Sequence, residues 1–332
     1  MTQQPVLHAT KQRRRLRELL ASKRFFPMPG GFSPIFAKLA QQAGYECFFL
    51  AGSQLAAYLY GVADNGFIGV RDVADHARHM AAAADIPILV DCDTGYGNAV
   101  NAHYAVEQMI ASGVAGLQIE DQEAPKKSSI GAGRRCIPVD EAIGKLKAAV
   151  AARDALDPDF VICARCDVLG AEGGSFEAAV SRSIAYVEEA GVDFVWLNSL
   201  ETPAQIAEAC ARVPAPIMTV YGGPHPRPTL AEYEALGLRF NLYIGLVMPF
   251  AVNAAWHALK DFKERGEEAI LERVNAVRDS PFGAVNMPEL TGEPRVRELE
   301  RRFIPAGQQR DYQTTWGHPT YFEGEGASKQ ER

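Results

Sequence analysis

The sequence predicts an α/β fold, a closed (β/α)8 barrel of the TIM type with an added N-terminal helix and a C-terminal helical extension. Short apolar, β-rich runs recur eight times along the chain, and helical patterns separate them. The runs are continuously apolar rather than alternating, which is typical of parallel strands covered by helices. Eight strand–helix repeats favour a closed barrel over an open sheet.

The predicted elements follow one another in regular order. The strands are expected at 25–28, 46–50, 86–90, 116–120, 160–164, 193–197, 216–220 and 239–244. The clearest helical patterns lie at 34–43, 101–112, 139–154, 175–190 and 203–212. We therefore divide the chain into an N-terminal helix (1–24), a catalytic barrel (25–265) and C-terminal helices with a polar tail (266–332). The last part is expected to be helical to about residue 304 and then loose or packed on a neighbouring subunit.

Composition limits the classes of partner. The chain has 332 residues, of which 47% are hydrophobic and 23% are charged, as in a globular protein. Its net charge of −7 gives no general support for binding nucleic acid or an anionic membrane. The basic cluster at 11–24 is read as a solvated helix face, because Leu16, Leu19 and Leu20 form an apolar stripe between the charges, with a binding patch or transit peptide as the alternative. With no long apolar run, we expect a soluble, cytoplasmic protein.

Polar residues gather where the predicted strands end, which is the face of a barrel that carries active sites. Asp91 and Asp93 share one face of a strand, because residues two apart point the same way. Two such carboxylates repel each other unless one is protonated or a cation lies between them. Glu120 ends the next strand, and Asp64 in a loop supplies a fourth carboxylate. This all-oxygen set suits Mg2+ or Mn2+ held partly through waters; the alternative is that the aspartates cap helices or bind Arg165 structurally.

Arg165 lies at the end of the predicted fifth strand, on the same face of the barrel as these carboxylates. A guanidinium binds carboxylates through two parallel hydrogen bonds, so Arg165 is a natural partner for an anionic substrate. A metal next to an arginine indicates a small di- or tricarboxylate-like ligand. The loop 122–136 contains Gly131, Ala132 and Gly133 among charged neighbours, which favours a flexible lid over the site.

Five segments, in this order and spacing, resemble the isocitrate lyase / phosphoenolpyruvate mutase superfamily. They are VDCDTGYGN (90–98), GLQIEDQ (116–122), PKK (125–127), FVICARCD (160–167) and AYVEEAGVDFV (185–195). The resemblance runs from about residue 15 to 265. It implies an α/β barrel, Mg2+, an enolate intermediate and a homotetramer in which a C-terminal helix is exchanged between subunits.

The resemblance also implies roles for single residues. The acidic metal shell of the family is matched by Asp64, Asp91, Asp93 and Glu120. A loop whose backbone amides hold the substrate carboxylate is matched by Gly52 and Ser53, and the substrate-binding arginine by Arg165. Asp93 is also expected to face the substrate.

The loop after the fourth strand departs from the pattern of the family. Carbon–carbon lyases of this family carry Lys-Lys/Arg-Cys-Gly-His there, with the cysteine as general acid. Here Lys126 and Lys127 match, but Ser128, Ser129 and Ile130 replace the last three residues. A serine hydroxyl is too weak an acid to take over the role of the thiol unaided. We expect Lys127 and Ser128 to be the catalytic candidates of this loop, beside Arg165.

Two further departures concern the substrate. Asn198 stands where isocitrate and methylisocitrate lyases carry a glutamate, and the segment 219–228 lacks their Asn and Thr, which disfavours cleavage of a tricarboxylate. The segments RRRLRELLAS and PIMTVYGG are similar to the cysteine-lacking branch with oxaloacetate decarboxylase and 2,3-dimethylmalate lyase-like members. The histidine of that branch near strand eight is missing here, and His225 is the candidate to replace it. Asn198 and His225 are therefore expected to contact substrate.

The sequence supports three functions. The leading one is Mg2+-dependent cleavage of a C–C bond next to a 2-oxo or 2-hydroxy carboxylate through an enolate, by a decarboxylase or lyase. The second is phosphonopyruvate-type mutase or hydrolase chemistry on a P–C bond. The third is a catalytically inactive barrel that binds a 2-oxo acid. The exact substrate and the general acid stay open, because the family shares one fold and metal site across these chemistries.

Overall fold

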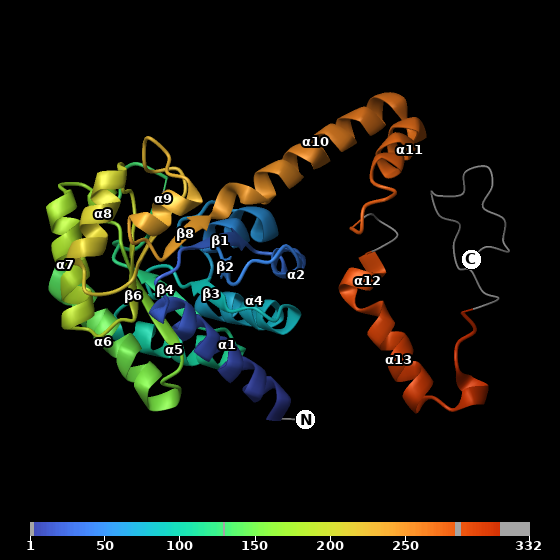
Figure 1. The fold of residues 1–332 in the computed structure, drawn as a ribbon, viewed down its shortest axis with the longest axis horizontal. Helices are drawn as coiled ribbons and strands as arrows, with labels where there is room; N and C mark the ends of the chain where they lie inside the picture. Colours follow the sequence, from blue (N-terminus) through green and yellow to red (C-terminus); the bar gives the residue numbers. More distant parts are fainter. Residues whose placement is uncertain (1–2, 129, 283–286, 313–332) are drawn as a thin grey trace. The chain divides into compact units, whose positions relative to one another are not determined.

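The computed structural model describes residues 3–128, 130–282 and 287–312. Eight parallel strands form a closed barrel in which each strand pairs with the next and the eighth pairs with the first (Figure 1). The strands are β1 (Phe26–Gly31), β2 (Phe48–Leu50), β3 (Ile88–Asp91), β4 (Gly116–Glu120), β5 (Val161–Cys166), β6 (Phe194–Leu197), β7 (Ile217–Val220) and β8 (Phe240–Tyr243). Each predicted strand overlaps an observed one, which confirms the (β/α)8 barrel.

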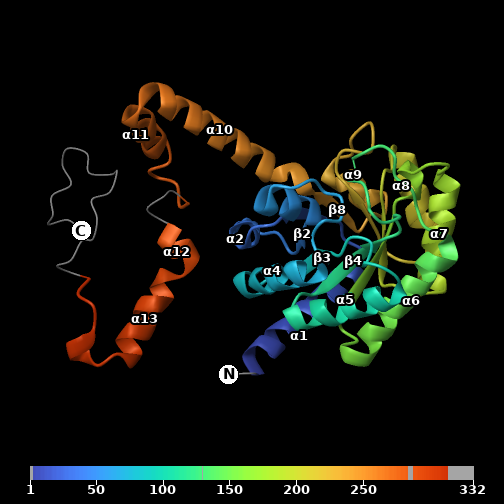
Figure 2. The ribbon, with the colours of Figure 1, turned by 180° about the vertical axis from the view of Figure 1, so that it is seen from behind.

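Helices cover the outside of the barrel, as the views from both sides show (Figure 2). They are α2 (Pro34–Gln42), α4 (Val70–Ala83), α5 (Ala99–Ser112), α6 (Val139–Leu156), α7 (Phe176–Glu188), α8 (Pro203–Arg212) and α9 (Leu230–Ala235). A short α3 (Gly52–Gln54) and the π-helical segment η1 (Leu55–Tyr60) follow β2, and Gly52 lies against Asp91 at the end of β3. The five helical patterns found in the sequence correspond to α2, α5, α6, α7 and α8.

Two apolar layers hold the strands in place. Alternate strand residues point inward and outward, so Phe49 packs inside the barrel while Phe48 packs between strands and helices. Cys163 belongs to the inner layer and Cys166 to the outer layer, so these two thiols point apart although they are only three residues apart in the sequence. Trp196 is fully enclosed inside the barrel, below the polar residues of the site.

Helix α1 (Gln3–Ala21) packs on the loops that lead into β4 and β5. Its apolar stripe of Leu16, Leu19 and Leu20 is buried against the inner layer. Arg13 is only 5% exposed; its guanidinium donates to the carbonyl oxygens of Val114 (3.1 Å) and Ile110 (2.6 Å) and pairs with Asp157. The expectation of a solvated basic face is therefore wrong for Arg13, because its guanidinium is buried against carbonyl oxygens and the carboxylate of Asp157.

The chain divides into two compact units, residues 1–248 and 249–332. The boundary falls at the start of α10 (Met248–Arg265), whereas the sequence analysis placed it after residue 265. The second unit continues with α11 (Glu267–Ala276), α12 (Met287–Thr291) and α13 (Glu293–Phe303). The polar tail after residue 312 lies outside the described residues. Among the described helices, none combines the length and the apolar character that crossing a membrane requires.

Replacing Arg13 by alanine is expected to lower the free energy of unfolding by about 3 kcal/mol, because Asp157 and two carbonyl oxygens lose a buried charged partner. Thermal and urea unfolding measure the loss. Arg14→Ala is the matched control, since the neighbouring Arg14 side chain is 68% exposed and pairs with Asp159 at the surface. Equal stability of both variants would show that the contacts of Arg13 do not hold α1 in place.

Candidate active site

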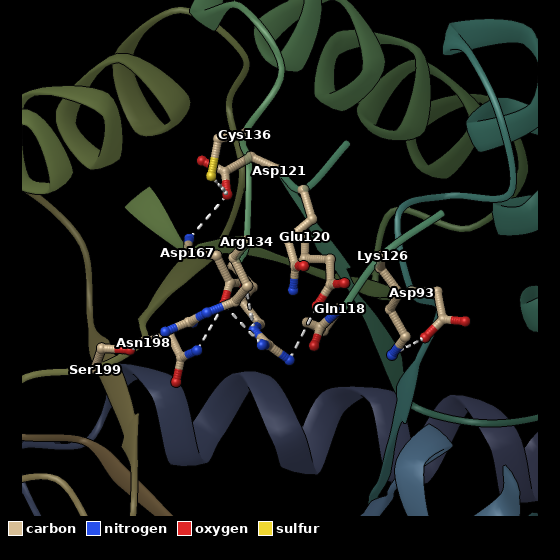
Figure 3. A network of polar contacts seen from close by, with 12 residues as sticks. Asp93, Gln118, Glu120, Asp121, Lys126, Arg134, Cys136, Asp167, Asn198 and Ser199 are labelled. Carbon is tan, nitrogen blue, oxygen red and sulfur yellow. Dashed lines mark hydrogen bonds and ion pairs between the residues drawn. The ribbon is translucent and has the colours of Figure 1, made fainter. Parts of the chain in front are cut away.

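Polar side chains from neighbouring strands meet at the mouth of the barrel (Figure 3). The strand register brings them together, because Asp91 lies opposite Gln118 and Glu120 lies opposite Arg165. They form two connected sets. We call the first the acidic group; it consists of Asp64, Asp91, Asp93, Glu120 and Lys126. We call the second the arginine group; it consists of Arg134, Arg165, Asp167, Asn198 and Ser199.

Asp91 is held by amide donors rather than by a charged side chain. Its Oδ2 accepts the backbone N–H of Gly52 at 3.2 Å, and its Oδ1 accepts those of Asp93 at 3.1 Å and of the Gln118 side chain at 3.3 Å. A Cβ at position 52 would lie 3.0 Å from Oδ2, so glycine allows this close approach. The Gly52 amide, which the resemblance assigns to substrate, thus also orients a carboxylate of the acidic group.

Lys126 places its ammonium group inside the acidic group. Its Nζ lies 2.7 Å from Asp64 Oδ1 and 2.5 Å from Asp93 Oδ1, and the lysine side chain is 3% exposed. Burial alone would lower the pKa of Lys126, but the surrounding carboxylates, Glu120 first, raise it well above its ordinary value. Asp93 adopts a left-handed backbone (φ 48°), a conformation that non-glycine residues seldom take and that occurs at functional sites.

Glu120 connects the two groups. Its Oε2 lies 3.0 Å from Nη1 of Arg165, while its buried Oε1 has no hydrogen-bond partner in the described part of the chain. Burial raises the pKa of Glu120 to about 8, although the positive charge of Arg165 opposes the shift. Burial likewise raises the pKa of Asp93 to about 6, against the effect of Lys126. In both cases the loss of water around the buried carboxylate outweighs the attraction of the nearby cation.

The acidic group suits a hard cation by its chemistry. A small cavity lies beside three of its carboxylates, Asp64, Asp91 and Asp93, and apolar side chains such as Leu55 and Phe67 form much of the remaining wall. The excess negative charge and the unpartnered Glu120 Oε1 are features that a divalent cation would satisfy. Within residues 3–128, 130–282 and 287–312, no three His, Cys, Asp or Glu side chains converge closely enough to bind one ion directly. Mg2+ or Mn2+, which favour oxygen ligands, would therefore reach these carboxylates partly through waters.

Arg165 is fixed in orientation at the centre of the arginine group. Its Nε lies 2.7 Å from Asp167 Oδ2 and its Nη2 donates to Asp167 Oδ1 at 2.9 Å, a two-point pairing. Its Cζ lies 4.3 Å from the centre of the Trp196 ring, so the guanidinium rests on the aromatic face below it. The amide of Asn198 donates to Asp167 Oδ1 at 2.6 Å. Asp167, Glu120 and the Trp196 ring therefore hold Arg165, the predicted substrate-binding arginine, and Asn198 supports it through Asp167.

Arg134 is a site residue that the sequence analysis missed. It comes from the loop 122–136, and its guanidinium donates to Asp167 Oδ1 at 2.7 Å and to Ser199 Oγ at 3.0 Å. The residue is 6% exposed, and Figure 3 shows it beside Asp167 and Ser199. The small residues of the loop predict a lid but give no role to its charged residues. The adjacent Arg134 and Arg135 are the signal that could have found this contact, because an arginine in this loop can reach the acidic end of a strand.

Other predicted residues lie apart from these groups or at their edge. Lys127 has an exposed side chain, and its backbone N–H donates to Gln122 Oε1 at 3.0 Å. Ser53 and Ser128 are half-buried. His225 is exposed in the loop after β7, where its backbone N–H donates to a carbonyl oxygen at 2.8 Å. The structure thus brings Asn198 into the site but leaves Lys127 and His225 facing solvent.

Asp121 forms a further polar centre behind the strands. Its Oδ1 lies 3.5 Å from Cys136 Sγ and accepts the backbone N–H of Asp167 at 2.8 Å. Its Oδ2 accepts the Tyr186 hydroxyl at 2.7 Å. Burial raises the pKa of the Cys136 thiol above its ordinary range, with Asp121 adding to the shift. Cys136 is thus a neutral donor to Asp121 and fixes the end of the loop rather than entering the site.

A (β/α)8 barrel with paired carboxylates, a buried lysine and an anchored arginine at its mouth is an enzyme scaffold with a site for a small polyanion. The family model described as phosphoenolpyruvate phosphomutase matches residues 16–264. The chain belongs to this family, within the isocitrate lyase / phosphoenolpyruvate mutase superfamily, where several proteins similar to it are lyases.

Three similar proteins illustrate the range of this family. 2,3-Dimethylmalate lyase of Eubacterium barkeri is 31% identical over 294 residues, which cover 87% of this chain and 97% of that protein. A structure of oxaloacetate acetylhydrolase with the inhibitor 3,3-difluorooxalacetate has a TM-score of 0.79 and 27% identity, covering 88% and 97% of the two chains. A structure of phosphonopyruvate hydrolase with oxalate and Mg2+ has a TM-score of 0.76 and 31% identity, covering 89% and 100%.

The raised pKa of Glu120 gives a pH dependence of stability. The folded protein retains a proton on Glu120 between pH 4.5, its ordinary value, and about 8, whereas the unfolded chain releases it. The free energy of unfolding of the metal-free protein is therefore expected to fall as pH rises through this interval, by about 2 kcal/mol between pH 6 and 8.5. Urea unfolding in EDTA at both pH values measures the change.

Glu120→Gln is expected to flatten this slope, because glutamine does not titrate. Glu123→Gln, which changes an exposed carboxyl in the following loop, is the control and is expected to keep the slope of the unsubstituted protein. An unchanged slope in Glu120→Gln would assign the proton to another group.

Proposed function

We propose that this protein cleaves a C–C bond next to a 2-oxo or 2-hydroxy carboxylate, with an oxaloacetate- or alkylmalate-like substrate and a divalent cation. The observation that carries the proposal is the contact between the two groups. Glu120, from the acidic group, lies 3.0 Å from Arg165, so a cation site and an anion-binding guanidinium sit side by side. Such a pair suits a reaction in which negative charge develops on an oxygen near a carboxylate.

Each part of the site has its own role in the proposed reaction. Arg165 binds one carboxylate of the substrate with the N–H groups that Asp167 and Glu120 leave free. The acidic group holds Mg2+, with Asp91 oriented by backbone amides and Asp64 and Asp93 sharing their charge with Lys126. When bound, the cation supplies positive charge that stabilises an enolate oxygen. Gly52 and Ser53 border the same site from α3.

No cysteine stands at the motif position from which a thiol would protonate the enolate carbon, and Cys136 of the same loop faces Asp121 instead. Ser128 occupies that position of the motif and is half-buried, and a hydroxyl is a poor acid at neutral pH. A reaction whose enolate can be quenched by solvent, such as a decarboxylation, needs this donor least. This supports a decarboxylase or an alkylmalate-type lyase over cleavage of a tricarboxylate, for which Asn198 also lacks a carboxylate.

A second candidate is hydrolysis or rearrangement of a phosphonopyruvate-like compound. The specific observation in its favour is the similarity to phosphonopyruvate hydrolase, which exceeds the similarity to the oxaloacetate acetylhydrolase structure in identity. Ser128 fits this alternative as well, since it needs no thiol acid.

The assembly and location stay expectations. The family resemblance implies a homotetramer with an exchanged C-terminal helix, and we propose that a second copy covers the apolar face of α10. Three large side chains of that helix, spaced three or four residues apart, are 45–69% exposed: Val252, Trp256 and Leu259. We further propose a cytoplasmic enzyme that acts on small molecules, without nucleic acid or membrane partners.

Asp91→Asn is expected to abolish stabilisation by Mg2+. In the unsubstituted protein, millimolar Mg2+ should raise the free energy of unfolding by roughly 1–3 kcal/mol through binding to the folded state. Asp91 is the informative position, because amide donors hold it and its loss leaves the ion pairs of Lys126 in place. Thermal unfolding and calorimetric titration with Mg2+ measure the effect. Asp75→Asn, a surface change, should keep the shift; a full shift in Asp91→Asn would refute the cation site.

A product assay with oxaloacetate, 2,3-dimethylmalate and phosphonopyruvate tests the proposed reaction. We expect turnover of one of the first two, and a loss of less than about tenfold in kcat for Ser128→Ala, since a general acid normally contributes at least 100-fold. Ser128→Cys is not expected to create fast cleavage of methylisocitrate. Turnover of phosphonopyruvate alone, or a collapse of activity in Ser128→Ala, would replace the C–C reaction by the P–C alternative.

A further inference from the structure

Arg134 occupies a slot that is built for its guanidinium. The slot is formed by Asp167, Ser199 and Gly170, which come from the ends of β5 and β6 and the turn after β5. A Cβ at position 170 would lie 1.8 Å from Arg134 Nη2 and 2.7 Å from Ser199 Oγ, so only glycine leaves room. Ser199 adopts a left-handed backbone (φ 65°), which is uncommon for serine. Two unusual backbone features therefore accommodate one loop arginine.

The charges around this slot explain what the arginine does. Asp167 is completely buried, and its carboxylate contacts Arg165, Arg134 and Asn198. Glu120 is also buried and pairs with Arg165 alone in the arginine group. Without Arg134, the charge of Arg165 would be spent on the ionised Asp167, and an anionic substrate would meet a site with no net positive charge. With Arg134, two guanidinium groups face Asp167, so one positive charge remains for the substrate.

We propose that Arg134 is the positioning residue that makes Arg165 available to the substrate, by neutralising Asp167 from the loop side. The inference deepens the proposed function, on which it rests, because it takes Arg165 as the group that binds a substrate carboxylate. Arg134 itself contacts Asp167 and Ser199 and acts through them. Binding of a small dicarboxylate therefore requires that the loop 122–136 has placed Arg134 in its slot.

A purely structural role of Arg134 predicts a different effect of its substitution by lysine. If Arg134 only anchored the loop, its geometry would matter more than its charge, and a lysine would serve no better than a neutral side chain. If it balances the charge of Asp167, a lysine should restore much of the binding. Oxalate, a dianion without a reacting bond, separates this question from catalysis, because its binding is measured without turnover.

The experiment measures oxalate binding by calorimetric titration in the presence of Mg2+, together with KM, kcat and Tm. Arg134→Gln is expected to weaken oxalate binding by about tenfold or more and to raise KM in parallel, because a buried carboxylate loses a charged partner. The loss in kcat should be smaller than the rise in KM. Arg134→Lys is expected to bind oxalate within about threefold of the unsubstituted protein.

Two further variants control the result. Arg135→Gln changes the neighbouring arginine, whose side chain is 64% exposed and pairs with Glu172, and it should leave oxalate binding unchanged. Gly170→Ala should reproduce the weakened binding of Arg134→Gln, since the added methyl group displaces the guanidinium. This variant also tests the inference should Arg134→Gln fold poorly.

Three outcomes would overturn the inference. Oxalate binding that Arg134→Gln leaves intact would do so while the proposed function stands. Arg134→Lys binding as weakly as Arg134→Gln would reduce Arg134 to an anchor of the loop. If the unsubstituted protein with Mg2+ binds no oxalate, the proposed function and the inference fail together.

Discussion

The pairing of Arg165 with Asp167 is the interaction on which the mouth of the barrel depends. Both side chains are almost completely buried, and a buried charge is tolerated only when an opposite charge and hydrogen bonds replace its water. Burial alone would raise the pKa of Asp167, yet the guanidinium of Arg165 lowers it, so the carboxylate stays ionised and keeps binding donors. Asn198 and Arg134 reach this carboxylate from β6 and from the loop. The position of one buried aspartate thus determines where three other polar groups can lie.

The two ends of the barrel use ionic contacts for different purposes. At the end covered by α1, Arg13 donates to carbonyl oxygens and pairs with Asp157, and these contacts close the inner apolar layer. At the opposite end, four carboxylates of the acidic group surround the single ammonium of Lys126, and one oxygen of Glu120 has no hydrogen-bond partner among the residues that the structure describes. Such an excess costs stability, and it persists where a ligand supplies the missing charge. This contrast supports reading one end as structural and the other as the site of reaction.

The loop between β4 and α6 carries most of what distinguishes this chain. It places Lys126 between Asp64 and Asp93, and it places Arg134 against Asp167, so it delivers one cation to each group of the site. In between lie the residues that replace the cysteine motif of the lyases. Relatives with the same barrel act on C–C and on P–C bonds, so the scaffold alone does not select the reaction. We propose that selection rests on side chains that the loop presents to the acidic group and to Arg165.

The sequence by itself determined the barrel, because eight continuous apolar runs can be buried on both faces only as parallel strands under helices. It also determined that Asp91, Glu120 and Arg165 lie at one end, since strand periodicity and strand ends locate them without knowledge of contacts. Only the tertiary structure decided that Lys126 rather than Lys127 turns inward, that Arg134 enters the site and that His225 does not. In an irregular loop no periodicity sets the direction of a side chain. There, the position of a distant carboxylate decides it, and that position exists only once the barrel has closed.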